Sequence, residues 1–190
     1  MELIEGLATR RSASAFASGC PPREQIGRLI EAATWAPNHH LTQPWRFAVL
    51  GGDERARFAD HLAAWIESDA GPPDRGPRLA ESTRAKVLRS PVIVVVIQRS
   101  DGADPERMLE DYAACCCATQ NLLLAAHAEG LAAKWSTGAM ATMPAARDYF
   151  GLGRDDRVVA YVYVGYPVAE AKMRLAERAP ALVSFRGFED

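Results

Sequence analysis

The chain has 190 residues, of which 48% are apolar and 24% are charged, a mixture typical of a folded globular protein. Its 24 acidic and 22 basic side chains leave a formal net charge of −2, so neither a nucleic-acid-binding surface nor a polybasic membrane anchor is expected. The length predicts a single domain, residues 1–190, with ample apolar material for a buried core.

The N-terminus and the apolar runs predict a cytoplasmic protein that does not enter a membrane. Residues 1–11 contain no long apolar stretch and no small-residue cleavage site, so no signal peptide is predicted. The longest strongly apolar run, Val92–Ile97, is far too short to span a bilayer.

The cysteines and histidines do not predict a metal site. Cys115, Cys116 and Cys117 are consecutive, and on a helix such residues point about 100° apart, so they cannot share one ion. No Cys-x-x-Cys pair is present, and the four histidines lack the spacing of metal ligands. We expect the cysteines to be small buried apolar side chains in a reducing compartment.

Two helices are predicted in the first part of the chain. Leu3, Ile4 and Leu7 indicate a short N-terminal helix that ends beside Arg10. A second helix opens at residues 21–22, which are both proline, and must stop before the next proline, residue 37. Its apolar side chains recur at helical spacing and give it one buried face; these residues are Ile26, Leu29, Ile30 and Ala33.

A strand and two more helices are predicted next. The strand covers residues 45–50, and a helix with Asp53 at its N-cap follows it. The proline-rich stretch 70–77 predicts an irregular surface connector, with a lid over a site as the alternative. Residues 79–88 predict a short helix.

The centre of the chain predicts a buried strand followed by a long helix. Val92–Ile97 shows no polar alternation, so a strand over residues 91–98 must be covered on both faces. The helix predicted over residues 105–129 has no charged side chain from Tyr112 to Ala128, which is unusual for a helix with an exposed face. We expect it to lie in the core and to form half of a subunit interface.

The remaining residues complete an α+β fold. Strands are predicted over residues 131–137 and 157–165, with a short helix over 141–150 between them, and the tail 166–190 has no clear period. The order of elements predicts a central mixed, mainly antiparallel sheet of about four strands surrounded by helices.

The usual catalytic and dinucleotide-binding motifs are absent from the sequence. Residues 151–156 begin like a dinucleotide fingerprint, but the third glycine is missing, and the segment follows a helix and precedes a strand, the reverse of the required order. No phosphate-binding P-loop and no Gly-x-Ser-x-Gly elbow occur. A bound prosthetic group that carries the chemistry is therefore the simplest enzyme hypothesis.

Two stretches suggest a pocket for a large, planar, phosphorylated ligand. Arg10-Arg11-Ser12 offers two guanidinium groups and a hydroxyl, which suit a phosphate. The loop 36–47 holds two prolines and several side chains that can stack or hydrogen-bond. Taken one at a time, the arginines could also be an exposed helix end, His39 and His40 exposed loop residues, and Trp45 part of the core.

Together these motifs resemble the nitroreductase family of FMN-dependent oxidoreductases, in particular its small subgroup with an Ala-Pro-Asp-His-type loop. The resemblance covers nearly the whole chain, and its motifs stand in the family's order. They are Arg10-Arg11-Ser12 with Phe16, Ala36-Pro37, Gln43–Phe47, Gly130–Gly138, Val158–Pro167 and Arg178-Ala179-Pro180.

The resemblance implies a homodimer in which each FMN is bound between two subunits. Arg10, Arg11 and Ser12 match the segment that holds the FMN phosphate and ribityl chain. His39 and Gln43 match loop positions that contact FMN bound mainly by the other subunit.

The resemblance also places the flavin ring and a second phosphate contact. The strand end that runs along the ring, where backbone N–H groups can donate to it, corresponds to Trp135, Ser136, Thr137 and Gly138. Arg178 in the tail matches the second phosphate contact. Asn38 and Leu41 stand where many relatives have Ser and Asn, a difference that concerns the substrate more than the flavin.

The implied activity is a two-electron, ping-pong transfer of hydride from NADH or NADPH through FMN to a small electron-poor acceptor, such as a nitroaromatic or a quinone. The flavin supplies the chemistry, so no catalytic side chain is expected. One alternative is a flavin-storage or flavin-modifying protein on the same fold without broad reductase activity. Another is an interaction module without flavin, whose uncharged helix is only a dimer interface.

Overall fold

The computed structural model of the chain describes residues 2–69, 75–102, 104–168 and 180–187. In chain order its elements are α1 (Leu3–Thr9), α2 (Arg23–Thr34), the 3-10 turn η1 (His39–Leu41), β1 (Trp45–Gly51), α3 (Gly52–Asp69), α4 (Arg75–Leu88), β2 (Val92–Gln98), α5 (Pro105–Ala128), β3 (Ala132–Ser136), α6 (Ala139–Thr142), α7 (Pro144–Phe150) and β4 (Arg157–Gly165).

The four named strands form one sheet in the order β1-β2-β4-β3. Each neighbouring pair is antiparallel, and the parallel contribution is an isolated bridge between Ser12 and Ala133. The α+β class and the four-stranded sheet are therefore confirmed. All seven residues of the inner strand β2 are buried, as its continuous valine and isoleucine run predicts.

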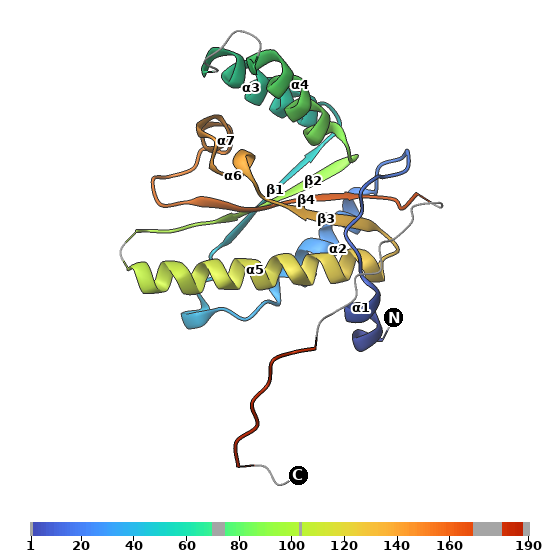
Figure 1. Ribbon diagram of the computed structural model, residues 1–190, viewed down its shortest axis with the longest axis vertical. Coiled ribbons are helices and arrows are strands. Elements are labelled where there is room, and N and C mark those ends of the chain that lie inside the picture. Colours follow the sequence, from blue (N-terminus) through green and yellow to red (C-terminus); the bar gives the residue numbers. More distant parts are fainter. Residues whose placement is uncertain (1, 70–74, 103, 169–179, 188–190) are drawn as a thin grey trace.

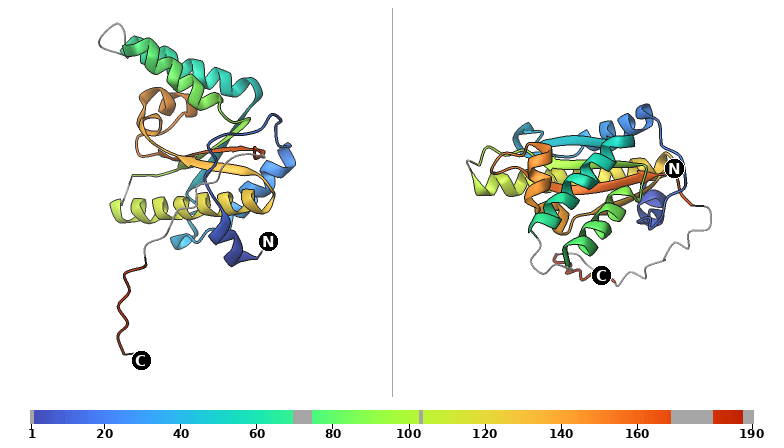
Figure 2. Two further views of the ribbon diagram at one scale, coloured as in Figure 1. Left: turned by 45° about the vertical axis from the view of Figure 1, so that its right-hand side comes forward. Right: turned by 90° about the horizontal axis from the view of Figure 1, so that it is seen from above.

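Helices cover both faces of the sheet. In Figure 1, α2 and α5 lie below the sheet, and α3, α4, α6 and α7 lie above it. The views in Figure 2 show the same order of layers after rotation. The strand order makes β1 and β3 the two edges of the sheet.

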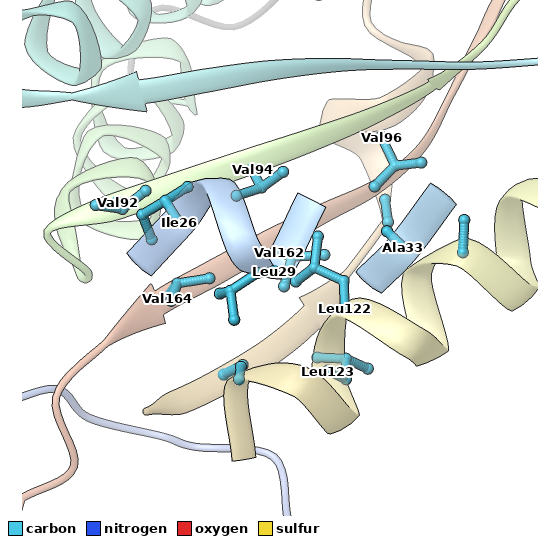
Figure 3. Close-up of a cluster of buried hydrophobic side chains, with 14 of the residues drawn as sticks. Ile26, Leu29, Ala33, Val92, Val94, Val96, Leu122, Leu123, Val162 and Val164 are labelled. Atoms are coloured by element: carbon cyan, nitrogen blue, oxygen red, sulfur yellow. The ribbon is translucent and has the colours of Figure 1, made fainter. Parts of the chain in front are cut away.

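The side chains of β2 alternate between two apolar layers because successive residues of a strand face opposite sides of a sheet. Val92, Val94 and Val96 pack with Leu29 of α2 and Leu122 of α5 (Figure 3). The intervening residues belong to a second cluster on the opposite face, to which α3 and α7 contribute. The apolar stripe predicted for α2 is thus confirmed as a core face.

The long helix α5 lies along the lower face of the sheet, and its expected role in the core is confirmed. Cys115 is buried there, and burial raises the pKa of its thiol to about 12. Cys117, which we expected to be buried, is exposed because it lies on the opposite side of the same helix. Cys20 is also exposed. Within the described ranges, no helix combines the length and hydropathy needed to cross a membrane.

Three local predictions differ from the structure. The helix α3 starts at Gly52, so Asp53 lies in its first turn instead of at the N-cap, where its charge still favours the helix N-terminus. The helix α4 starts at Arg75, because a proline such as Pro77 is tolerated in a first turn that needs no hydrogen bond from its nitrogen. Residues 70–74 of the expected connector lie outside the described residues.

The third difference is that Met143 divides the expected helix 141–150. The chain is extended at Met143, with φ −66° and ψ 129°, and Pro144 opens α7. Because a residue before proline is biased toward extended backbone, α6 and α7 are separate helices. Gly151 ends α7 in the left-handed conformation, which favours glycine.

We expect the folded protein to lose stability as the pH rises above about 10. Burial raises the pKa of Tyr161, and burial together with a hydrogen bond to Glu54 raises the pKa of Tyr149 from 10.0 to about 12. A folded-state pKa above the unfolded one contributes stability that is complete below pH 10 and is lost as the pH rises through the folded value. Urea unfolding between pH 9 and pH 11 measures this loss, which should be smaller in Tyr149→Phe.

Candidate functional site

The segment that joins α1 to α2 is bonded to the end of the sheet. Ser12 forms its bridge with Ala133 of β3, and the backbone N–H of Ala17 donates to the carbonyl of Tyr166 at 2.9 Å. These backbone contacts join parts of the chain that are far apart in the sequence. They keep Arg10, the residue that caps the C-terminal end of α1, near the β3 edge.

The arginine pair is partly withdrawn from solvent. Nη1 of Arg11 donates to the carbonyls of Ala8 and Arg10 at 2.6 and 2.8 Å. Its Nε is buried and has no hydrogen-bond partner among the described residues. A buried N–H without an acceptor is costly, so an anionic oxygen placed here would be favourable. The segment therefore fits a phosphate group.

At the C-terminal end of β3, the groups available to a ligand are backbone atoms more than side chains. Trp135 packs against the core cluster below the sheet, so its ring supports the strand. Ser136 is half-buried, and Thr137 and Gly138 are exposed before α6 begins. Gly138 has φ 70° and ψ −164°, a conformation that is essentially restricted to glycine. Such a strand end can present backbone N–H groups to a flat ligand.

The loop before β1 is strained. His40, Leu41 and Gln43 have φ values of 53°, 51° and 44°, and they are the only non-glycine residues with positive φ in the part of the chain that the structure describes. Each such conformation costs on the order of 1–3 kcal/mol and persists only where the surroundings impose it. His39, His40 and Gln43 are exposed. The loop thus presents polar side chains from a constrained backbone.

The two groups of predicted site residues lie at opposite corners of the sheet. The register aligns Ala133 of β3, across β4 and β2, with Gly51 at the end of β1. The loop lies at the other end of β1, before Trp45. Three strand spacings and six residues along the strand separate Ala133 from Trp45 by roughly 25 Å. One chain therefore brings Arg10-Arg11-Ser12 close to the Ala133 end of β3 and leaves the loop with His39 and Gln43 at the opposite end of β1.

The outer side of α5 is exposed, and from Tyr112 onward the helix carries no charged side chain. Leu109, Ala113 and Cys117 recur every four residues, so they lie on one helix face, and all three are exposed. The neighbouring turn η1 contacts α5 and exposes Leu41 to 79%. We call Leu41, Leu109, Ala113 and Cys117 the α5 face. Contiguous exposed apolar residues of this kind mark an interaction surface.

Sequence reasoning missed the residues that hold the loop in place. The side-chain oxygen of Asn38 accepts a hydrogen bond from the backbone N–H of Gln43 at 3.0 Å, and Thr42 donates to Asp111 of α5 at 2.6 Å. Asn38 is visible in the sequence as a residue that can bond to its own loop. Asp111 is not, because no local pattern connects it to Thr42. Arg178, the predicted second phosphate contact, lies outside the described residues.

Comparison with known proteins gives one consistent result. The model of the Nitroreductase family matches residues 7–166. The chain is 31% identical over 171 residues to a protein of Escherichia coli K12 that is provisionally named NAD(P)H nitroreductase YdjA, and the match covers 90% of this chain and 91% of that protein.

Two crystal structures are similar over most of the chain. A nitroreductase-like family protein from Bacillus cereus is 26% identical, with a TM-score of 0.77, and the match covers 97% of this chain and 92% of that one. A protein from Desulfovibrio desulfuricans that is provisionally named a nitroreductase, solved in complex with FMN, is 27% identical, with a TM-score of 0.70 and coverage of 93% of this chain and 91% of that one.

Proposed function

The chain belongs to the nitroreductase family, and from this premise we propose that it is an FMN-dependent oxidoreductase that uses NADH or NADPH to reduce a small electron-poor acceptor, such as a nitroaromatic or a quinone. FMN, when bound, would supply the two-electron chemistry that links oxidation of the nicotinamide to reduction of the acceptor. The whole chain, residues 1–190, forms one FMN-binding domain in this proposal.

The observation that carries the proposal is the position of Arg10-Arg11-Ser12 on the β3 edge. The guanidinium groups would hold the phosphate, with the buried Nε of Arg11 as one donor, and Ser12 would bind the ribityl chain. Residues 135–138 at the end of β3 would hold the flavin ring, with their backbone N–H groups as donors. Arg178 adds a second phosphate contact. The flavin would supply the chemistry and the protein its orientation and a dry ring face, so no side chain is needed as nucleophile or base.

The proposal requires a homodimer. In one chain, Trp45, which directly follows the loop with His39 and Gln43, lies roughly 25 Å from Ala133 beside the phosphate segment, so we assign these two side chains to a flavin held across a subunit interface. The α5 face supplies that interface, since its uncharged, exposed residues bury without the cost of desolvating charges. Two subunits related by a two-fold axis then form two identical sites.

The visible absorption spectrum tests the cofactor directly. We expect purified protein, loaded with FMN and dialysed, to retain about one flavin per chain. The loaded protein should then oxidise NADH or NADPH faster when a quinone or nitroaromatic is added. Retained FMN without that turnover would support the flavin-storage alternative, and colourless protein that ignores FMN would contradict both.

A glycine substitution tests the end of β3. Gly138→Ala places a side chain in a conformation that costs about 1–3 kcal/mol. We expect a lower melting temperature, and weaker FMN binding because the backbone along the ring must shift. Gly27→Ala is the matched control: Gly27 lies in α2 with nothing within 4 Å of an added Cβ, so this change should raise the melting temperature slightly and leave FMN binding unchanged. Differential scanning fluorimetry and FMN titration measure the two effects.

A further inference from the structure

The strained loop is tied to the rest of the molecule at one side chain. Thr42 stands between Leu41 and Gln43, which both have positive φ. Its hydroxyl donates to Oδ1 of Asp111 at 2.6 Å, while Asn38 bonds only within the loop itself. Among the side-chain hydrogen bonds of the described loop residues 38–43, Thr42–Asp111 is the one that reaches another element, the helix α5.

Asp111 is a shielded partner for this bond. Its residue exposure is 7%, and it lines a hollow of about 280 Å³ together with Thr42, Gln43 and two arginines. Those arginines pair with other carboxylates: Arg99 with Asp156 at 3.3 Å, and Arg107 with Asp101 at 3.9 Å. A hydroxyl bonded to a shielded carboxylate is a strong, directional contact. It can hold backbone that would otherwise relax.

We propose that the Thr42–Asp111 hydrogen bond is a latch that keeps the loop His39–Gln43 in the shape that contacts the flavin held by the partner subunit. Thr42 and Asp111 are then positioning residues, and they act on the site of the other chain. This inference rests on the proposed function, because it needs FMN at the subunit interface. It explains why a loop with three unfavourable backbone conformations is retained beside the α5 face.

Variants at Thr42 test the hydroxyl itself. Thr42→Val keeps the shape and removes the donor, and we expect FMN to bind about tenfold more weakly, measured by quenching of flavin fluorescence. Thr42→Ser restores a hydroxyl and should bind within about threefold of the wild type. Asp111→Asn keeps an oxygen acceptor without its charge and should fall between the two. Melting temperatures of the flavin-free proteins separate a lost latch from a lost fold.

Mixed dimers test whether the latch acts across the interface. A dimer of one Thr42→Val chain and one Arg10→Ala chain has one site in which the phosphate segment and the partner's loop are both intact. We expect it to bind one FMN per dimer with wild-type affinity. A wild-type chain paired with a chain that carries both changes has no such site, and its tighter-bound FMN should bind about tenfold more weakly than in the wild type.

The alternative outcomes are distinct. If the latch acts on its own chain's flavin, the two mixed dimers exchange behaviours, and the proposal is overturned. Equal FMN affinity of wild type and Thr42→Val also overturns the latch and leaves the proposed function intact. Failure of the wild-type protein to bind FMN at all overturns the proposed function, and the latch with it.

Discussion

Arg10→Ala should yield a folded protein that loses FMN on dialysis. Arg10 ends α1 and is held beside β3 by the backbone contacts of the segment that follows it. A hydrogen bond to a charged group contributes about 1.5–3 kcal/mol, so removal of the guanidinium should weaken FMN binding by roughly 10- to 100-fold. Absorption at flavin wavelengths after dialysis, and titration with FMN, measure the loss.

Two further substitutions make the Arg10 experiment specific. Arg10→Lys keeps the charge without the two-pronged geometry and should bind FMN with intermediate affinity. Arg78→Ala is the matched control, since Arg78 is an exposed arginine on α4, on the other side of the sheet from α5. Full retention of tightly bound FMN by Arg10→Ala would show that the phosphate lies elsewhere.

Ala113→Asp should convert the proposed dimer into a monomer and remove FMN at the same time. Ala113 lies on the α5 face, where an interface would bury two like charges, one from each chain, without a partner. A monomer keeps its own Arg10 but lacks the partner's loop, so both halves of the site are separated. Light scattering after gel filtration gives the mass, and the absorption spectrum gives the flavin content.

Ala64→Asp is the control for this change. Ala64 is also an exposed alanine in the interior of a helix, but it lies in α3, on the opposite side of the sheet. It should leave both the mass and the flavin content as in the wild type. A dimeric, flavin-loaded Ala113→Asp protein would mean that the interface does not involve the α5 face.

The elements that the sequence predicted well are those with a strong local pattern. The stripe of α2 and the valine and isoleucine run of β2 are set by the 3.6-residue and two-residue periods of helix and strand, which need no knowledge of neighbours. Boundaries were predicted less well. The start of α4 and the break at Met143 depend on how a proline is used, and a proline suits both a connector and a first helical turn.

The sequence by itself determined the fold class, the two groups of motifs (Arg10-Arg11-Ser12 and the loop 36–47) and the uncharged part of the long helix, because each follows from patterns among neighbouring residues. Only the tertiary structure decided where those parts lie. Strand pairing brings Ser12 to Ala133 and carries the loop to the opposite corner of the sheet. The same folding joins Thr42 to Asp111, which are 69 residues apart in the chain. Such contacts are formed by burial and register across the whole sheet, and no local period encodes them.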